Sequence, residues 1–220
     1  MTTRRSFLKH AGSIVLYFNM VPVRAVAQAA AAPELPTSLA AYPELDTWLR
    51  IAADGRVTLS PGKCELGQGI QTALGQIAAE ELDVSLDRVS VMNVDTDSSP
   101  DEGYTNGSRS VEVSGPAVRA AAAEVRAMLV ELAAGELGVD PGRVGVRDGV
   151  FTLDGSDTGL DFAAVIKDLS LARSATGLVT PKGRDQYHTV GKSLQRVDIP
   201  RKAFAEPAYI QDIRLEGMLH

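Results

Sequence analysis

The chain is poor in the side chains that bind metals through nitrogen or sulfur. Its 220 residues include one cysteine, Cys64, and three histidines. A single cysteine excludes a disulfide within the chain. Cys64 and the scattered histidines also do not supply the ligand set of a zinc, haem or iron–sulfur centre. We therefore expect no metal held by protein side chains, and any iron–sulfur cluster that works with this protein must lie on another chain.

Several common functional signatures are also missing. The sequence has no Gly-x-Ser-x-Gly elbow, so hydrolase chemistry has no support. Its acidic loop over residues 95–102 lacks the later glutamate of a calcium-binding EF-hand. With 22 basic and 28 acidic residues the net charge is −6. An acidic protein has no electrostatic reason to bind nucleic acid or anionic lipid, so neither is expected as a partner.

The N-terminus has the features of an export signal. Arg4-Arg5, followed by Phe7-Leu8, forms a twin-arginine motif, and residues 11–23 supply a modest apolar region. Ala25-Val26-Ala27 offers a cleavage site of small residues. The apolar region is too short and too interrupted to span a bilayer. We predict a twin-arginine signal peptide over residues 1–27, a periplasmic mature protein and no membrane span.

Hydrophobic periodicity and two Asp-Gly turns predict an α+β fold. The turns are Asp54-Gly55 and Asp148-Gly149. The second long helix should begin near Pro116, which suits a first helical turn, and end at Gly135. The expected strands cover residues 47–53, 56–60, 89–94, 143–147 and 150–153, and the expected helices cover residues 68–82, 116–134 and 161–169.

One stretch of the sequence is echoed 55 residues later. Residues 81–91 and 136–146 both contain the end of a helix, a short turn and a Val-x-Val strand. Two such helix–turn–strand units predict a pair of helices packed on one face of a mixed sheet. The loops that precede the two helices, residues 67–69 and 106–110, should then lie on a common edge.

Gly67-Gln68-Gly69 immediately precedes the first long helix. Glycine lets the backbone turn sharply and approach a ligand closely, and the free N–H groups of a first helical turn favour an anion. Gln68 adds a donor and an acceptor at the same place. A phosphate or a polar heterocycle could dock here. On the local pattern alone, however, a structural tight turn is the commoner interpretation, and the Rossmann and P-loop patterns are both incomplete.

Three sequence blocks, taken together, resemble a known family. The first is Lys63 to Leu74 with Ala79-Glu80-Glu81-Leu82, the second is residues 105–110 and 114–121, and the third is residues 196–200, 209–213 and 217–220. In this order they resemble the molybdopterin-binding large subunit of the xanthine dehydrogenase/aldehyde oxidase family, of the isoquinoline 1-oxidoreductase beta-subunit type. The resemblance runs from about residue 48 to the end and implies the N-terminal portion of that subunit.

The resemblance implies which residues contact the cofactor. In the family, a Gly-Gln-Gly loop and a Gly-Ser block contact the pterin and phosphate parts, and the corresponding residues are Gly67, Gln68, Gly69, Gly107, Ser108, Arg109 and Ser110. Arg109 could meet a phosphate bidentately, or it could form an ordinary surface salt bridge. The pterin dithiolene holds the metal, so Cys64 is expected as a small buried residue. No catalytic residue is expected, because the family's catalytic glutamate lies near the end of a much longer chain.

Composition and the resemblance together predict a domain organisation. Residues 28–43 are rich in Ala and Pro, so residues 28–46 are expected to form a flexible lead-in, and the resemblance implies a partial molybdopterin-binding domain over residues 47–170. Residues 171–207 form a connector, and residues 208–220 begin a following, truncated domain. The alternative for residues 209–213 is a closing strand of a complete domain.

The implied cofactor is molybdenum-molybdopterin in its cytosine dinucleotide form. The implied partners are a small subunit with [2Fe–2S] clusters, the remainder of the large subunit and a cytochrome c electron acceptor. The complete assembly would hydroxylate N-heterocycles or oxidise aldehydes with oxygen from water, and these 220 residues alone should not. The alternative is a non-enzymatic exported binding or assembly domain that retains the scaffold.

Overall fold

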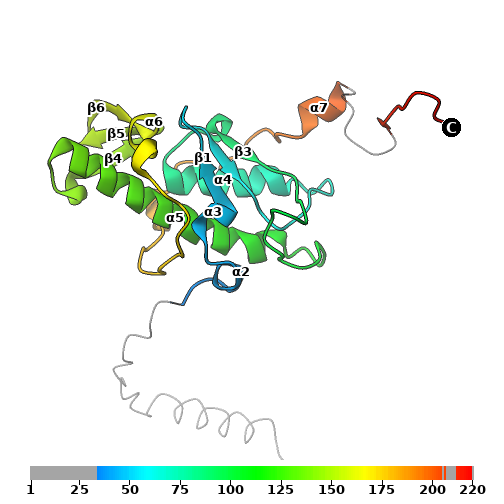
Figure 1. Cartoon of the computed structure of the whole chain (residues 1–220), viewed down its shortest axis with the longest axis horizontal. Coiled ribbons are helices and arrows are strands. Elements are labelled where there is room, and N and C mark those ends of the chain that lie inside the picture. Colours follow the sequence, from blue (N-terminus) through cyan, green and yellow to red (C-terminus); the bar gives the residue numbers. More distant parts are fainter. Residues whose placement is uncertain (1–33, 205, 207–211, 220) are drawn as a thin grey trace, which may run out of the picture. The chain divides into compact units, whose positions relative to one another are not determined.

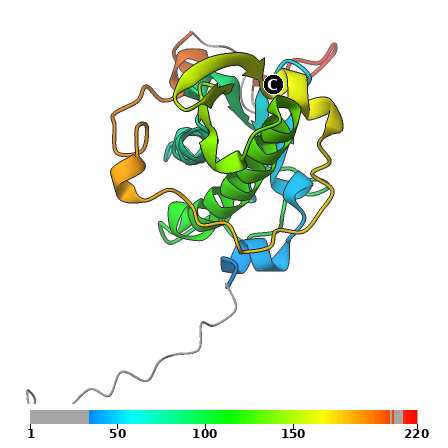
Figure 2. The same ribbon diagram turned by 90° about the vertical axis from the view of Figure 1, so that its left-hand side faces the viewer.

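The computed structural model describes residues 34–204, 206 and 212–219 (Figures 1 and 2). The chain divides into two units, residues 1–33 and residues 34–220, and only the second contains described residues. The predicted signal peptide lies outside the described residues. Within the described ranges, no helix has both the length and the apolar character that crossing a bilayer requires.

The chain folds into helices and two small sheets, which confirms the predicted α+β class. The helices are α2 (Thr37–Ala41), α3 (Leu45–Trp48), α4 (Ile70–Leu82), α5 (Ser110–Leu137), α6 (Phe162–Val165) and α7 (Ile199–Ala203). The strands are β1 (Leu49–Ile51), β2 (Val57–Leu59), β3 (Val89–Val91), β4 (Val144–Arg147), β5 (Val150–Leu153) and β6 (Ser156–Asp161). Single 3₁₀ turns lie at Leu86–Arg88, Pro141–Arg143, Ile166–Asp168 and Arg184–Gln186.

The strands form two three-stranded sheets. β1 pairs antiparallel with β2 across the predicted Asp54-Gly55 turn, and β2 pairs in parallel with β3. Parallel neighbours need a crossover connection, which α4 supplies. β4, β5 and β6 pair antiparallel in sequence order. The two helix–turn–strand units therefore do not share the one mixed sheet that the sequence predicted. The second unit has its own sheet, because the tight turns at Asp148-Gly149 and Asp154-Gly155 complete its pairing locally.

The long helix α5 differs from its expected bounds at both ends. It begins at Ser110 rather than near Pro116, and it ends at Leu137 with Gly138 as its left-handed cap rather than at Gly135. Pro116 lacks the N–H that would bond to the carbonyl of Glu112. Both residues are exposed, so this gap in the hydrogen bonding faces solvent and the helix continues through it.

The two helix–turn–strand units agree closely in structure. The C-terminal caps, Asp83 of α4 and Gly138 of α5, are both in the left-handed conformation, with φ of +55° and +66°. The cap N–H of Asp83 donates to the carbonyls of Ala79 and Glu80, and that of Gly138 donates to the two equivalent carbonyls of α5. A 3₁₀ turn and a strand follow each cap. The echo in the sequence is thus an echo in the fold.

Helices α4 and α5 lie side by side and run parallel (Figures 1 and 2). Near the middle of α4, a Cβ on Gly115 would come 3.4 Å from Ile77 Cδ1. One turn further along both helices, Arg119 Nε donates to Glu81 Oε1 at 2.9 Å. The contacts advance in the same direction on the two helices, so both N-termini lie at the same end. The loops that precede them therefore share an edge, as predicted.

The described part of the predicted flexible lead-in is packed into the core, so the prediction of flexibility was wrong for it. Residues 37–46 contain α2 and the start of α3, and Leu39 and Leu45 are almost fully buried. They pack in one cluster with Trp48, Leu74 and Leu129. The Ala- and Pro-rich composition predicted mobility, but two leucines are enough to anchor the segment once the long helices offer them an apolar surface.

The predicted connector is bound along the helices through a strap, which we define as residues 174–190 (amber to orange in Figure 2). Buried carboxylates of α4 and α5 accept its backbone N–H groups. Glu124 accepts from Thr176 and Gly177 at 3.0 and 2.7 Å. Glu80 accepts from residues 188, 189 and 190 at 2.9, 2.5 and 2.7 Å. These charge-assisted bonds give an irregular segment a fixed path.

Candidate functional site

Two loops form the predicted edge: a first loop (residues 62–69) before α4 and a second loop (residues 101–110) before α5. In the first loop, Gly67 and Gly69 have φ of +103° and +82°, which favour glycine. The Gln68 side chain closes on its own loop: its Nε2 donates to Cys64 O at 2.8 Å and its Oε1 accepts from Leu66 N at 2.6 Å. Gln68 is exposed, but its amide is already hydrogen-bonded.

The N-terminus of α4 already has an anion bound to it. The carboxylate of Glu65 accepts the N–H groups of Gly67, Gly69 and Gln71 at 2.8, 3.0 and 3.2 Å. Burial raises the pKa of this carboxyl, but the three N–H donors outweigh burial and hold the pKa below its ordinary value. The sequence predicted that these N–H groups would favour an external anion. In this structure the anion is a side chain of the same loop.

The second loop leaves its helix N-terminus open. Gly107 and Ser108 both have positive φ, +59° and +58°, and direct the chain into α5. Among the described residues, no acceptor pairs with the N–H groups of Ser110, Val111 and Glu112. Ser110 is buried, whereas the three residues before it are exposed. A long helix with free N–H groups and an adjacent cation is a favourable place for an anion.

A buried lysine ties the two loops together. Lys63 is 5% exposed, and its ammonium group donates to the carbonyls of Glu102, Gly103 and Tyr104 at 2.6, 3.3 and 3.0 Å. Gly62 N also donates to Glu102 Oε2 at 2.9 Å. Lys63 belongs to the first resemblance block, but the sequence could not predict its role. Its hydrogen-bond partners are backbone atoms about 40 residues away. The predicted common edge is confirmed by these bonds.

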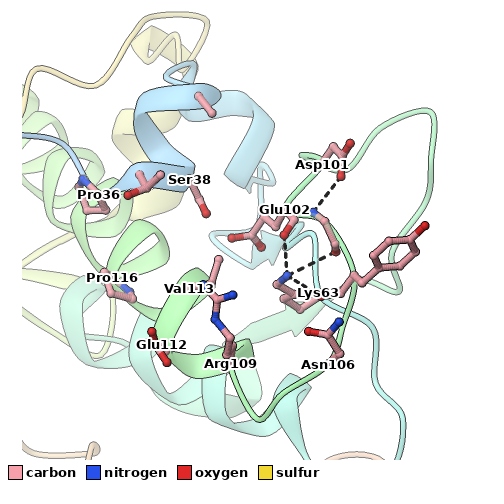
Figure 3. Close-up of a pocket in the computed structure, with 14 residues that line it drawn as sticks. Pro36, Ser38, Lys63, Asp101, Glu102, Asn106, Arg109, Glu112, Val113 and Pro116 are labelled. Atoms are coloured by element: carbon pink, nitrogen blue, oxygen red, sulfur yellow. Dashed lines mark hydrogen bonds between the residues drawn. The ribbon is translucent and has the colours of Figure 1, made fainter.

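A cavity of about 700 Å³ opens beside this junction (Figure 3). Its wall includes Lys63 and Glu102 at the junction, Arg109 and Asn106 of the second loop, and Ser38 of α2. A second cavity of about 740 Å³, lined by residues of both loops, adjoins it. Both volumes fall in the range of small-molecule sites. Arg109 is thus a predicted site residue that lines a cavity.

Cys64 differs from its expectation. It is exposed rather than buried: its backbone N–H donates to Thr105 Oγ1 at 2.9 Å, and the residue lines the second cavity. Within the part of the chain that the structure describes, no three His, Cys, Asp or Glu side chains gather closely enough to hold a metal ion. His188 is exposed, and its backbone N–H bonds to Glu80.

Comparisons with known proteins agree on one family. The sequence matches the molybdopterin cofactor-binding domain over residues 17–204. A nicotinate dehydrogenase subunit of Pseudomonas putida is 37% identical over 177 residues, which cover 80% of this chain and 15% of that protein. The beta subunit of isoquinoline 1-oxidoreductase from Brevundimonas diminuta is 28% identical, over 99% of this chain and 32% of that protein.

A solved structure shows the same fold. CO dehydrogenase from Oligotropha carboxidovorans superposes with a TM-score of 0.50 at 27% identity, over 58% of this chain and 17% of that chain. This chain therefore spans less than a third of the length of each protein compared here.

Proposed function

The chain belongs to the family of molybdopterin cofactor-binding domains, and we propose that it forms the N-terminal cofactor-binding portion of a molybdenum hydroxylase large subunit. The observation that carries this proposal is the shared edge where two parallel helices begin. There Arg109 and the free N–H groups of α5 can meet a phosphate, and Gly67 can let a flat ring approach closely. When bound, the molybdenum cofactor supplies the redox centre of the enzyme.

The residues at this edge fit such a cofactor in one respect and restrict it in another. Open donors at Ser110, Val111 and Glu112 suit a phosphate. At α4 the Glu65 carboxylate uses the N–H groups of Gly67 and its neighbours, so a second anion there would meet like charge. We therefore expect the anionic part of the cofactor at the second loop and a neutral, hydrogen-bonding part at the first.

The wider activity follows from the family and is part of the proposal. The assembled enzyme would hydroxylate N-heterocycles or oxidise aldehydes with oxygen from water, pass electrons to [2Fe–2S] clusters on a small subunit and then to a cytochrome c. The cofactor would be the cytosine dinucleotide form, and the enzyme would work in the periplasm. Relatives named for nicotinate and isoquinoline support the N-heterocycle class.

A second candidate is a non-enzymatic exported domain that binds or assembles a partner. One observation favours it: Gln68 and the N–H groups of the first loop are already paired within the loop. Such a domain would need no cofactor, so the molybdenum content of the assembled protein separates the two candidates.

The test is Arg109→Gln in the complex assembled from this chain and its co-expressed partner subunits. Molybdenum would be measured by mass spectrometry and pterin by the fluorescence of its oxidation product. Loss of charge-assisted bonds worth about 1.5–3 kcal/mol should lower cofactor affinity by roughly tenfold or more. The matched control is Arg147→Gln, at an exposed position of β4 in the other sheet. It should keep the wild-type content of molybdenum and pterin.

Two outcomes would contradict the proposal in different ways. A wild-type complex without molybdenum would favour the assembly domain. Full occupancy in Arg109→Gln would show that the second loop does not hold the anionic part of the cofactor.

A further inference from the structure

We propose that Arg196, oriented by Asp198, is a positioning residue that sets the conformation of the Gly67–Gly69 loop. The proposal rests on the proposed function, which places this loop at the cofactor. It assigns residues 196–198 to the site itself, although the sequence places them in a connector about 130 positions away.

Arg196 contacts the loop at two points. Its Nη1 donates to Gly67 O at 2.7 Å, and its Nη2 lies 3.6 Å from Glu65 Oε1. Its side chain also lies directly against Gly69, where a Cβ would come 3.4 Å from Arg196 Nε and 3.5 Å from Cδ. The guanidinium therefore bonds to the loop carbonyl and faces the carboxylate that holds the loop N–H groups, and a Cβ at position 69 would touch the Arg196 side chain at ordinary van der Waals distance.

Asp198 fixes the orientation of the guanidinium. Its two carboxylate oxygens accept from Arg196 Nε and Nη2 at 2.9 and 2.6 Å, a bidentate pair, and Lys202 Nζ donates to the same carboxylate at 2.7 Å. Between them, Val197 N donates to Thr72 Oγ1 at 3.0 Å, which fastens the segment to the first turn of α4. The planar guanidinium is held at its own site before any ligand arrives.

The charges around Arg196 explain why this position requires a cation. The Glu65 and Asp198 side chains are only 8% and 7% exposed, and the Arg196 guanidinium lies between them. The hydrogen bonds from Arg196 hold the pKa of Asp198 well below its usual range. Without this cation, the two buried carboxylates would face each other with only Lys202 and the loop N–H groups to offset their charge, which is unfavourable. The arrangement would then separate, and the bond to Gly67 O would be lost.

The loop needs such a restraint because its glycines do not restrain it. Gly67 and Gly69 can adopt many backbone conformations, and a Cβ on Gly67 would meet no atom of the described residues within 4 Å beyond the adjoining backbone. Glu65 holds the N–H side of the loop, and Arg196 holds its carbonyl side. Holding one conformation in advance lowers the entropy lost when a ligand binds.

The experiment compares Arg196→Gln, Arg196→Lys and Asp198→Asn in the assembled complex. Hydrogen exchange at the amides of Gly67, Gly69 and Gln71 is the first readout, and molybdenum and pterin content is the second. Arg201→Gln is the matched control, because Arg201 lies on α7 and its ion pair among the described residues is with exposed Glu206.

We expect Arg196→Gln to speed exchange of these amides about tenfold or more while the later turns of α4 keep their protection. Cofactor content should fall in the same variant. Arg196→Lys should rescue little, because a lysine has the charge but not the planar fork that bonds Asp198 and Gly67 together. Asp198→Asn should change exchange in the same direction, and Arg201→Gln should change neither readout.

The outcomes separate this inference from the proposed function. A wild-type complex that contains molybdenum, with Arg196→Gln unchanged in both readouts, would overturn the role of Arg196 alone. Equal acceleration along all of α4 would also overturn it, because that would mean general loss of structure. Faster exchange confined to the loop, in a complex without molybdenum, would support the role of Arg196 and reject the proposed function.

Discussion

At the scale of single residues, buried glutamate side chains accept hydrogen bonds from backbone N–H groups. Glu65, Glu80 and Glu124 each accept two or more main-chain N–H groups from irregular segments. A loop that packs against a helix brings N–H groups out of water, and each one needs an acceptor. In the sequence no pattern marks these glutamates as acceptors for distant N–H groups. In the fold they fix the first loop and the strap.

The hydrogen bonds that Glu80 accepts from residues 188–190 lead us to expect that this part of the strap detaches from α4 in acid. Burial raises the pKa of Glu80, but the N–H groups of His188, Val190 and Thr189, together with Lys182, lower it below the ordinary 4.5. Because the folded-state pKa is the lower one, this stabilisation is present in full above pH 4.5 and is lost as the pH falls through the folded-state value. We expect residues 188–190 to become sensitive to exchange and proteolysis in acid before the helices do.

The variant Glu80→Gln checks the origin of this effect. It should expose residues 188–190 already at pH 7 and remove their acid response. Glu131→Gln, an exposed position on α5, should retain the wild-type pH profile. Detachment in acid that is unchanged by Glu80→Gln would show that another group titrates.

At the scale of elements, the C-terminal ends of α4 and α5 have the same structure but different residue types. Asp83 and Gly138 occupy equivalent caps, yet only Gly138 is a glycine. Asp83 adopts the left-handed conformation while its side chain bonds to buried Lys182, so a tertiary contact supports a local conformation that glycine would adopt freely. Sequence periodicity located both helices, but the two alternative glycines, Gly135 and Gly138, left the end of α5 open to error.

Substitution of those two glycines should give opposite results. In the described part of the chain, a Cβ at either position would meet no atom within 4 Å beyond the adjoining backbone, so only the backbone conformation matters. Gly135 lies inside α5, and Gly135→Ala should stabilise the protein by about 0.5–1 kcal/mol. Gly138 has φ of +66°, and Gly138→Ala should destabilise it by roughly 1–2 kcal/mol.

The measurement is the free energy of unfolding of the full chain by urea titration. The wild type and both variants should show the same slope, since the substitutions do not change the surface exposed on unfolding. The reverse order of stabilities would place the end of the helix at Gly135.

At the scale of the whole molecule, this chain spans a small part of its relatives' length and shares their cofactor-binding family. Its proposed export fits that role. Twin-arginine transport carries folded proteins, so a subunit could receive its cofactor before it leaves the cytoplasm. The motif lies in residues 1–27, outside the described part of the chain, and its test is a cellular one.

Replacing both Arg4 and Arg5 with lysine should retain the protein in the cytoplasm, because the twin-arginine pathway distinguishes the pair from other cations. Cell fractionation followed by immunoblotting measures the distribution. Arg24→Lys, a change of the same kind elsewhere in the segment, should leave export unchanged. Periplasmic recovery of the double variant at the control level would mean that the protein does not depend on this motif.

The sequence by itself determined the family, the α+β class, the Asp-Gly turns and the two helix–turn–strand units. These features depend on local patterns: apolar periodicity, left-handed turn residues and motif order. The same local logic correctly placed the first and second loops on a common edge. It was wrong about residues 37–46, about both ends of α5 and about the burial of Cys64, because tertiary packing outweighed a local preference in each case.

Only the tertiary structure decided how the candidate site is held together. Lys63 bonds to carbonyls about 40 residues away, and Arg196 to a carbonyl 129 positions before it. The Glu65 carboxylate accepts N–H groups at the start of α4, where the sequence predicted an external ligand. Such contacts join a side chain to a backbone group, and every residue carries the same backbone groups. No residue pattern marks the partner, so these contacts become visible only when folding brings the two segments together.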